Sequence, residues 1–388
     1  MSKTWGGTMK LYSVLMVGGF LAVLSTDLWA EKAFVYSALV EQSGVIACSS
    51  DESVSCELSA VAWVKGDNHG QIIWGNDKTP KSANESGVFA MSYTGKVFQA
   101  DVVKTFYFFS PFSQIGKIEA MSSTPDGRFA MVATAFDRFD ENNAELDKYN
   151  TLIVWPTATP EKAKVVLPSQ RQGIESSLAL RNRIANAIQR KYGKQATYFK
   201  VEGLALLPGN RLLFGIREIG QNYASFDYRV VLLEGHYQVL GEEFVLDRQA
   251  ELEVICDFSA VADTVGRKVG LSSIEYDALQ KRLYLLTSYE DNHSGKIGAY
   301  MWVVPVADDG VLGAIELVKN ADGLPFEFTH KAEGLAVLED GRVLIVHDDD
   351  RNLTDVHIGG ANGGQLRTRK SNEAAFDILR VFKKSRPQ

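Results

Sequence analysis

The repeat that decides the fold reads Lys117-Ile118-Glu119-Ala120-Met121, Lys200-Val201-Glu202-Gly203-Leu204 and Lys331-Ala332-Glu333-Gly334-Leu335. Nine residues after each Glu, a second apolar run begins with an Arg: Arg128, Arg211 and Arg342. The residues between the two runs, such as Pro125-Asp126-Gly127, have the composition of turns that join antiparallel strands. Each copy is therefore predicted to be a β-hairpin, and self-similarity at this spacing is typical of repeat folds.

Two weaker copies extend the repeat. Ser273-Ile274-Glu275-Tyr276 keeps the Glu but reaches its Arg282 two residues sooner, and Ser59-Ala60-Val61-Ala62-Trp63 has Ser59 in place of the Glu. Starts at 59, 119, 202, 275 and 333 lie 60, 83, 73 and 58 residues apart, which suits a four-stranded blade with its loops. The sequence predicts an all-β, five-bladed β-propeller. Residues 79–115 leave room for a sixth, degenerate blade, and a pair of two-sheet sandwiches would explain the strands but not the recurring Glu and Arg.

A third strand is predicted after each later hairpin, at residues 150–155, 228–233, 299–306 and 375–382. The last of these and residues 33–39 would close the ring by placing both termini in one blade. The long spacing of 83 residues contains apolar residues at helical intervals within 171–192. We expect an inserted α-helix there, either a lid or brace packed on the propeller or a partner-binding element.

The N-terminus has the features of a secretion signal. Lys3 and Lys10 precede an apolar run at 11–24, and Leu28-Trp29-Ala30 offers a small residue for cleavage. This predicts a signal peptide at 1–30, a single propeller domain at 31–388, and a periplasmic or secreted protein. The apolar run of 14 residues is shorter than the roughly 20 needed to span a bilayer, so a retained membrane anchor is the weaker alternative.

The net charge indicates which classes of partner the protein can bind, and the cysteines indicate whether a disulfide is expected. The net charge of −7 argues against nucleic acid or an anionic membrane as the main partner and favours cations. In an exported protein, Cys48 and Cys56 are predicted to form a disulfide across a short polar loop. Cys256 then remains as a thiol in an apolar run, where it is expected to serve packing.

Carboxylates are predicted to gather on one rim of the propeller. The first two strands of a blade are antiparallel, so the start of one and the end of the next share a rim. The starts carry Glu119, Glu202, Glu275 and Glu333; the ends carry Asp77, Asp137, Glu218, Glu290 and Asp348-Asp349-Asp350. Hard oxygen ligands in such number favour calcium, with magnesium or manganese next. We predict a calcium ion held by Glu119, Glu202, Glu275, Glu333 and Asp349.

A structural role for these Glu residues is the alternative. Lys117, Lys200 and Lys331 lie two residues ahead of three of them and would share a strand face with them. Zinc is disfavoured, because the six His residues show no metal-ligand spacing. His347, Asp348 and Arg351 are the predicted catalytic residues, as general base, metal neighbour and anion-binding group; a solvated acidic loop is the other interpretation.

The phrases Val201-Glu202-Gly203-Leu204-Ala205, Ala332-Glu333-Gly334-Leu335-Ala336 and Val346-His347-Asp348-Asp349-Asp350 carry a resemblance to known propellers. They resemble exported bacterial propellers grouped as phytase-like with esterase-like activity, and a related uncharacterised family with the same Glu-Gly-Leu-Ala phrase. More distantly, the opening Glu-Gly is similar to that of regucalcin, gluconolactonase and paraoxonase, where a Glu so placed helps to hold calcium.

The resemblance implies a metal-dependent hydrolase that acts on a small-molecule ester or phosphoester. The chain lacks the Asp-Asp-Pro-Ala segment of true β-propeller phytases, which argues against phytate as the substrate. A propeller without catalytic activity is the rival hypothesis: it would bind an envelope protein or a glycan and use the cation for structure only.

Overall fold

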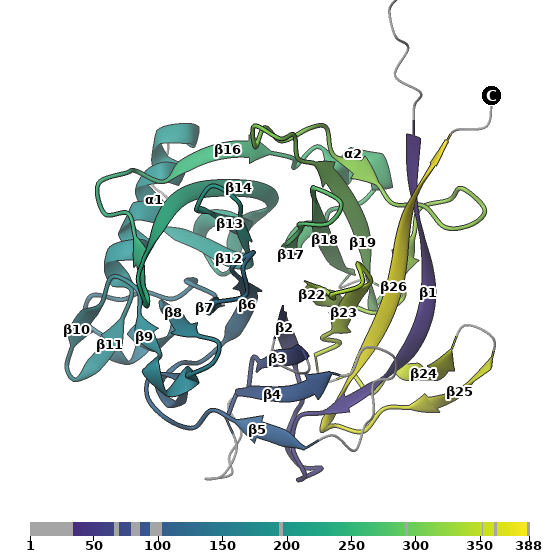
Figure 1. Ribbon diagram of the computed structural model, residues 1–388, viewed down its shortest axis with the longest axis horizontal. Helices are drawn as coiled ribbons and strands as arrows, with labels where there is room; N and C mark the ends of the chain where they lie inside the picture. The colour runs from purple at the N-terminus through teal and green to yellow at the C-terminus, as the bar shows by residue number, and fades with distance from the viewer. Residues whose placement is uncertain are drawn as a thin grey trace, which may run out of the picture.

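The computed structural model describes residues 34–65, 70–78, 86–93, 103–193, 197–291, 294–350, 352–360 and 363–385. The predicted signal peptide at 1–30 lies outside them. Five β-sheets stand as blades around a central axis (Figure 1). The predicted five-bladed propeller is therefore confirmed, and the sandwich alternative is wrong.

The first two blades each have four strands, numbered from the axis outward. Blade 1 consists of β2 (Leu58–Val64), β3 (Gly70–Asn76), β4 (Val88–Tyr93) and β5 (Lys104–Phe106). Blade 2 consists of β6 (Ile118–Ser123), β7 (Phe129–Thr134), β8 (Leu152–Pro156) and β9 (Lys164–Val165). The strands within 79–115 thus complete blade 1, and they do not form a sixth blade.

The next two blades have five strands each. Blade 3 consists of β12 (Tyr198–Leu207), β13 (Arg211–Asn222), β14 (Ser225–Leu240), β15 (Glu243–Leu246) and β16 (Glu253–Asp257). Blade 4 consists of β17 (Gly270–Asp277), β18 (Arg282–Asp291), β19 (Lys296–Pro305), β20 (Glu316–Leu317) and β21 (Glu327–Phe328). The short helix α2 (Val261–Val265) connects blades 3 and 4.

Both ends of the chain meet in blade 5, as predicted. Its strands are, in spatial order, β22 (Ala332–Val337), β23 (Val343–His347), β26 (Glu373–Ser385), β1 (Phe34–Ala47), β24 (Asp355–Gly360) and β25 (Gly363–Thr368). β1 and β26 pair antiparallel along their whole length, from Phe34 opposite Ser385 to Ala47 opposite Glu373. This pairing closes the ring, because it joins the N-terminal strand to the last strand of the chain within one blade.

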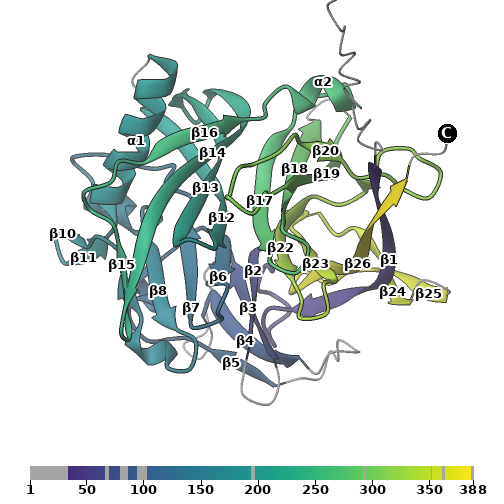
Figure 2. The same cartoon turned by 45° about the horizontal axis from the view of Figure 1, so that its top comes forward.

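The innermost strands β2, β6, β12, β17 and β22 line the axis and are buried almost throughout (Figure 2). Each inner strand is covered by neighbouring blades on both faces, which is why its sequence is nearly continuous in apolar residues. Between blades 3 and 4, for example, Leu213 and Leu271 share one apolar cluster with Trp302. The core therefore consists of layers between blades, and the polar residues of the inner strands need a special explanation.

The inserted helix α1 (Leu178–Tyr192) lies outside blades 2 and 3. Its apolar face, with Leu180, Ile184 and Ile188, packs into the apolar cluster of these two blades, as expected of a brace. The helix begins later than the predicted 171–192, because the preceding segment forms the hairpin of β10 (Ser169–Arg171) and β11 (Ile174–Ser176). In the described residues, neither helix is long and apolar enough to cross a membrane.

Candidate functional site

The innermost strand of every blade contains one residue that interrupts its pairing. In β6, Ile118 pairs with Thr134 and Ala120 with Ala133, so Glu119 is left over as a β-bulge. The equivalent residues in β2, β12, β17 and β22 are Ser59, Glu202, Ser272 and Glu333. A bulge re-aims its side chain, and bulges are common beside functional sites. The bulge position therefore explains how a strand buried on both faces can present a polar side chain to the axis.

Three of the predicted metal ligands converge at these bulges. Carboxylate oxygens of Glu119, Glu202 and Glu333 all lie within 4.8 Å of one another, and we call these residues the channel trio. Lys200 Nζ lies 3.0 Å from Glu119 Oε1 and also pairs with Glu202, while Lys331 Nζ lies 2.9 Å from Glu333 Oε1. The repeat thus brings its carboxylates together and partly neutralises them with its own lysines.

The channel trio carries perturbed pKa values. Burial, together with the charge of Glu202, raises the pKa of Glu119 well above its usual range, against the effect of Lys200. Burial also raises the pKa of Glu202. For Glu333 burial acts in the same direction, but Lys331, Lys200 and Arg217 outweigh it and lower the pKa. Glu202 Oε2 is buried and accepts no hydrogen bond from the part of the chain that the structure describes. The trio can therefore still bind a proton or a cation.

The second-strand ends lie on the same rim, as predicted. Lys331 Nζ is 2.7 Å from Glu290 Oε1, and Arg217 Nε is 3.5 Å from Glu218 Oε1. Lys117 likewise pairs with Asp137 at the end of the second strand of blade 2. The Lys117–Asp137 pair joins the start and the end of one hairpin, the Lys331–Glu290 pair joins blade 5 to blade 4, and Arg217 and Glu218 are neighbours within β13.

Glu275, the fourth predicted ligand, does not join the channel trio. It lies three residues beyond the bulge of its strand, where Ser122 Oγ donates to Glu275 Oε1 at 3.2 Å and the Tyr276 N–H donates at 3.1 Å. Burial raises the pKa of Glu275 to about 8. The repeat was aligned on the spacing between Glu and Arg, whereas the true equivalent, Ser272, precedes Arg282 by ten residues. Blade 4 thus has a Ser where the alignment placed a Glu.

The predicted ligand Asp349 also points away from the axis. Its Oδ2 lies 2.7 Å from His330 Nδ1 and accepts a hydrogen bond from Thr354 Oγ1 at 2.6 Å. Burial acts to raise the pKa of Asp349, but these partners outweigh it and bring the pKa to about 2. Asp349 is therefore an ionised partner of His330.

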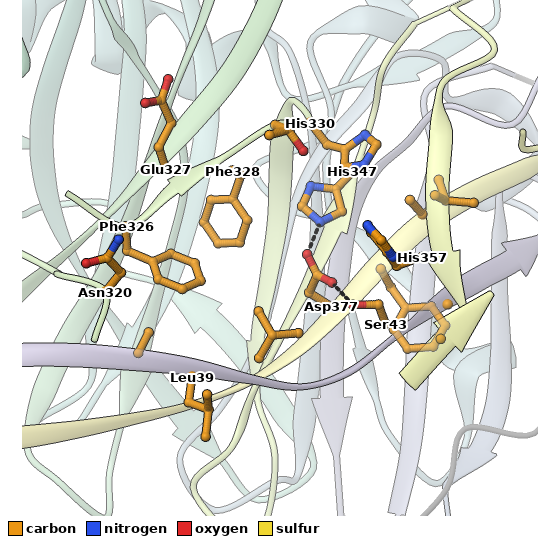
Figure 3. Close-up of a pocket in the computed structure, with 18 of the residues that line it drawn as sticks. Leu39, Ser43, Asn320, Phe326, Glu327, Phe328, His330, His347, His357 and Asp377 are labelled. Carbon is orange, nitrogen blue, oxygen red and sulfur yellow. Dashed lines mark hydrogen bonds and ion pairs between the residues drawn. The ribbon is translucent and has the colours of Figure 1, made fainter. Parts of the chain in front are cut away.

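His347 and Asp348 are adjacent but lie in different sites. His347 Nε2 is 2.9 Å from Asp377 Oδ2, on the side away from the channel (Figure 3). Asp348 faces the axis, where Ser59 Oγ donates to its Oδ2 at 3.1 Å. Successive residues at a strand end point to opposite faces, so the predicted catalytic combination of these two residues is not assembled. Arg351, the third predicted catalytic residue, lies outside the described residues.

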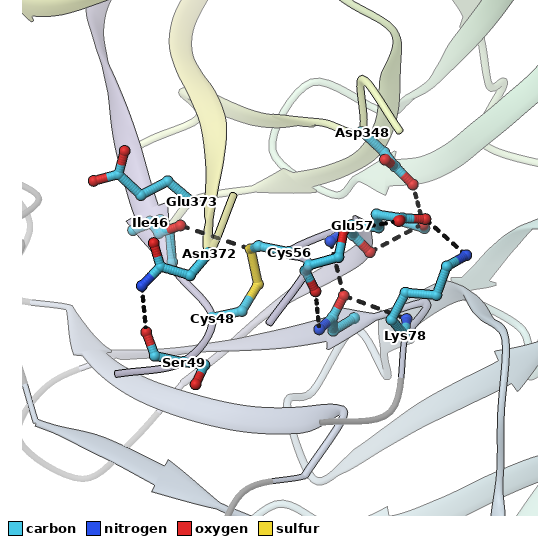
Figure 4. The surroundings of a disulfide bond; sticks show 12 residues. Ile46, Cys48, Ser49, Cys56, Glu57, Lys78, Asp348, Asn372 and Glu373 are labelled. Atoms are coloured by element: carbon cyan, nitrogen blue, oxygen red, sulfur yellow. Dashed lines mark hydrogen bonds and ion pairs between the residues drawn. A yellow bond between two sulfur atoms is a disulfide. The ribbon is translucent and has the colours of Figure 1, made fainter. Parts of the chain in front are cut away.

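A second group of carboxylates lies at the mouth of the channel. Oxygens of Glu57, Asp348 and Asp350 lie within 4.8 Å of one another, and we call these residues the outer triad. Figure 4 shows two of them, Glu57 and Asp348. Lys78 Nζ is 2.7 Å from Glu57 Oε2, and Lys331 Nζ is 3.5 Å from Asp350 Oδ2. Asp348 forms no ion pair with a basic side chain of the described ranges. Burial and the charge of Glu333 raise its pKa well above the usual range.

Sequence reasoning missed Glu57, although the repeat contains a signal for it. Glu57 lies two residues ahead of the bulge residue Ser59, which is the position of the Lys in blades 2, 3 and 5. The predicted disulfide between Cys48 and Cys56 is confirmed and lies next to it, with Cα atoms 5.4 Å apart. Because Cys56 directly precedes Glu57, the disulfide ties the end of β1 to the start of the channel-lining strand.

A basic cavity opens on the same rim beside both carboxylate groups. It has a volume of about 600 Å³, and we call it the basic pocket; its charged lining consists of Asp77, Lys78, Lys117, Arg138 and Lys148. Tyr149 adds an aromatic face, with the Arg138 guanidinium 4.6 Å from the centre of its ring. Two of these lysines connect the basic pocket to the carboxylate groups. Lys78 pairs with Glu57 of the outer triad, and Lys117 lies near Glu119 of the channel trio. One rim thus offers carboxylates and an anion-attracting pocket side by side.

Comparisons with known proteins add little. No protein-family model and no curated protein matches the chain. Among solved structures, an α-L-arabinofuranosidase from Podospora anserina is similar with a TM-score of 0.42 and 7% identity, over 90% of this chain and 98% of that one. The periplasmic gluconolactonase of Pseudomonas aeruginosa gives a TM-score of 0.36 and 13% identity, over 91% and 99%. Likenesses this weak carry no conclusion about activity.

Proposed function

We propose that this propeller is a divalent-cation-dependent hydrolase of anionic esters, with phosphoesters as the first class to test. The observation that carries the proposal is the outer triad beside the basic pocket. Glu57 of the outer triad and Lys78 of the basic pocket form an ion pair. Groups that suit a cation and groups that suit an anionic substrate are therefore in direct contact at one rim.

The outer triad fits a hard cation better than the channel trio does. Its three carboxylates come from two neighbouring blades, and among the described residues Asp348 has no ammonium partner such as Lys200 gives to Glu119 and Glu202. Carboxylate oxygens alone favour calcium, with magnesium or manganese next. Glu57, Asp348 and Asp350 would hold the ion, which when bound would polarise a substrate oxygen and acidify a bound water.

The basic pocket would bind and orient the negative group of the substrate. Arg138 offers a planar fork that suits two phosphate oxygens, and Lys148 a mobile point charge. Lys78 and Lys117 lie between this pocket and the carboxylates, so they would place the anion next to the cation. The Glu-Gly-Leu-Ala resemblance supports the same class of activity, and the basic and apolar segments of residues 1–30 support export to the periplasm or beyond.

A binding propeller without catalysis is the second candidate. It is favoured by the ion pairs of Lys200, Lys331 and Arg217 with the channel trio, which are what a purely structural network would contain. In this case the basic pocket would recognise an anionic group on an envelope protein or a glycan.

Hydrolysis assays separate the two candidates. The purified protein would be stripped with chelator and assayed with p-nitrophenyl phosphate and p-nitrophenyl acetate, with and without calcium, magnesium or manganese. We expect cation-dependent phosphoester hydrolysis that is lost in Asp348→Asn and strongly reduced in Arg138→Met. The control Glu175→Gln changes an exposed residue of β11 and should be fully active. A folded protein that hydrolyses neither ester with any of the three cations would contradict the enzyme and leave the binding propeller.

A further inference from the structure

A second cavity lies outside the channel, on the blade that holds both termini. Its volume is about 580 Å³, and its walls come from β1, β21, β23, β24, β26 and the loop before β21 (Figure 3). Phe326 and Phe328 lie on one side, and His330, His347 and His357 lie on the other. We call it the histidine pocket. The hydrolase proposed above makes no use of it.

Two imidazoles in this pocket are each held by a carboxylate. His347 Nε2 lies 2.9 Å from Asp377 Oδ2, and His330 Nδ1 lies 2.7 Å from Asp349 Oδ2. The ring centres of the two histidines are 5.2 Å apart. A carboxylate partner fixes the orientation of an imidazole and decides which nitrogen carries the hydrogen.

The free nitrogen of His347 is a hydrogen-bond acceptor when the ring is neutral. Burial acts to raise the pKa of Asp377, but the hydrogen bond to His347 outweighs it and lowers the pKa. An ionised carboxylate can only accept, so the nitrogen that faces it carries the hydrogen. In a neutral His347 ring this leaves Nδ1 without a hydrogen. Burial acts to lower the pKa of His330, but the hydrogen bond and charge of Asp349 outweigh it and raise the pKa, which favours a protonated ring whose two nitrogens both donate. His347 Nδ1 is buried and has no partner within the described ranges, which is rare for a buried polar atom and calls for a donor.

Serine chemistry is excluded by the order of the groups. Ser43 Oγ donates to Asp377 Oδ1 at 2.5 Å, and the same carboxylate contacts His347. The carboxylate therefore stands between the serine and the histidine, whereas an activated serine needs the imidazole next to its hydroxyl. This arrangement can bind a ligand, but it cannot generate a serine nucleophile.

The charge of the histidine pocket is opposite to that of the basic pocket. Its described lining contains the acidic residues Asp322, Glu327 and Asp377 and no Lys or Arg. Phe326, Phe328 and Phe376 also line it, and aromatic faces attract cations. Asp349 balances the charge of His330 whenever that ring is protonated. Acceptors, negative charge and aromatic rings together select a ligand that donates hydrogen bonds and carries positive charge.

We propose that the histidine pocket binds an organic amine, a ligand with an apolar body of about one or two rings and a protonated amino group. The apolar body would pack against Phe326 and Phe328, and the ammonium would donate to Asp377 and to Nδ1 of His347. A cavity of about 580 Å³ is in the size range of small-molecule sites.

A series of ligands with one body and three charges tests this directly. 2-Phenylethylamine, 2-phenylethanol and phenylacetate would be titrated into the full purified protein by calorimetry. We expect the amine to bind about tenfold more tightly than the alcohol, because a charge-assisted hydrogen bond is roughly twice as strong as a neutral one. Phenylacetate should not bind. Equal or tighter binding of phenylacetate, or no binding of the amine at millimolar concentration, would overturn the proposal.

Variants then locate the site. Asp377→Asn should remove the preference for the amine over the alcohol, and Phe328→Leu should weaken both ligands; Glu175→Gln, on an exposed strand far from the pocket, should change neither. Since Asp377 also holds Ser43 and His347, the variant protein could fail to fold. Proton and nitrogen NMR of the wild-type imidazoles avoids this problem. The amine should shift the signals of His330 and His347, and unshifted signals at saturation would contradict the assignment.

Discussion

Blades 2, 3 and 5 differ from blades 1 and 4 at a single structural position. The first three place a Glu in the inner-strand bulge and a Lys two residues ahead of it, whereas blades 1 and 4 have a Ser in the bulge. In blade 1, Ser59 donates to Asp348 of blade 5 at 3.1 Å, and in blade 4, Ser272 donates to the Ala332 carbonyl at 2.7 Å. Three of the five blades thus contribute paired charges, and in blade 1 the shorter Ser59 makes room for an additional carboxylate. The difference teaches that the bulge aims a side chain at the axis, and that the residue found there decides whether a blade contributes charge.

The largest loss of unfolding free energy is expected when a lysine that pairs with the channel carboxylates is removed. Lys200→Met removes the ammonium between Glu119 and Glu202 and leaves two buried carboxylates without it. Removing one partner of a buried pair typically costs about 3–5 kcal/mol of unfolding free energy. Chemical denaturation measures this loss. The control Lys281→Met, whose side chain is 60% exposed and pairs with Asp308, should cost less than about 1 kcal/mol. Equal losses for both variants would show that the channel pairs do not stabilise the fold.

Glu275 tests the same comparison through pH. Its pKa rises from 4.5 to about 8 on folding, so the folded protein keeps a proton that the unfolded chain releases. Stability from this group is complete below pH 4.5 and is lost as the pH rises to about 8. Glu275→Gln should remove that loss and be more stable than the wild type at pH 8, by on the order of 4 kcal/mol. Thermal or denaturant unfolding between pH 4.5 and pH 8 measures this difference. If the unfolding free energies of the two proteins changed with pH in the same way, Glu275 would be ionised in the folded state.

Calcium should stabilise the wild type but not a protein with a broken outer triad. Calcium at 100 times its dissociation constant would add about 2.7 kcal/mol to the unfolding free energy. Asp348→Asn removes the one triad carboxylate that has no basic partner in the described ion pairs, so its melting temperature should not respond to calcium. Differential scanning calorimetry with calcium and with chelator measures both responses. Glu275→Gln is the matched control and should respond as the wild type does.

The smallest change in unfolding free energy is expected from removing the bulge serine of blade 1 or of blade 4. Ser59→Ala leaves an oxygen of the buried Asp348 without its hydrogen bond, which should cost about 2 kcal/mol because a buried acceptor is left unsatisfied. Ser272→Ala deprives only a backbone carbonyl of its donor and should cost about 1 kcal/mol. Urea unfolding of the two variants gives the order. The reverse order would contradict a stabilising hydrogen bond from Ser59 to Asp348.

Local patterns predicted the fold well, because each hairpin contains its own turn and its own apolar strands. The Lys-x-Glu copies and the third strands follow from sequence neighbours, whereas the shared terminal blade follows from the closure of the ring by strands at opposite ends of the sequence. The bulge was not predictable, because a single unpaired residue leaves no periodic mark, and this is why Glu275 was aligned in place of Ser272.

The candidate site was predicted only in part for a similar reason. Glu119, Glu202 and Glu333 meet as expected, but the outer triad depends on Glu57 and Asp348, which are 291 residues apart in the sequence. The segment from His347 to Asp350 also contributes to two sites, because its side chains alternate in direction. His347 contacts Asp377 in the histidine pocket, whereas Asp348 accepts a hydrogen bond from Ser59 at the axis. The basic pocket depends in the same way on contacts between blades 1 and 2 that no spacing within one blade encodes.

Calorimetric titration of calcium into chelator-stripped protein tests the central claim, that the asymmetric rim forms a cation site at the outer triad, most directly. We predict one calcium site in the wild type, the same site in Glu275→Gln, and no binding in Asp348→Asn. Calcium that bound Asp348→Asn as tightly as the wild type, or that failed to bind the wild type, would contradict the account.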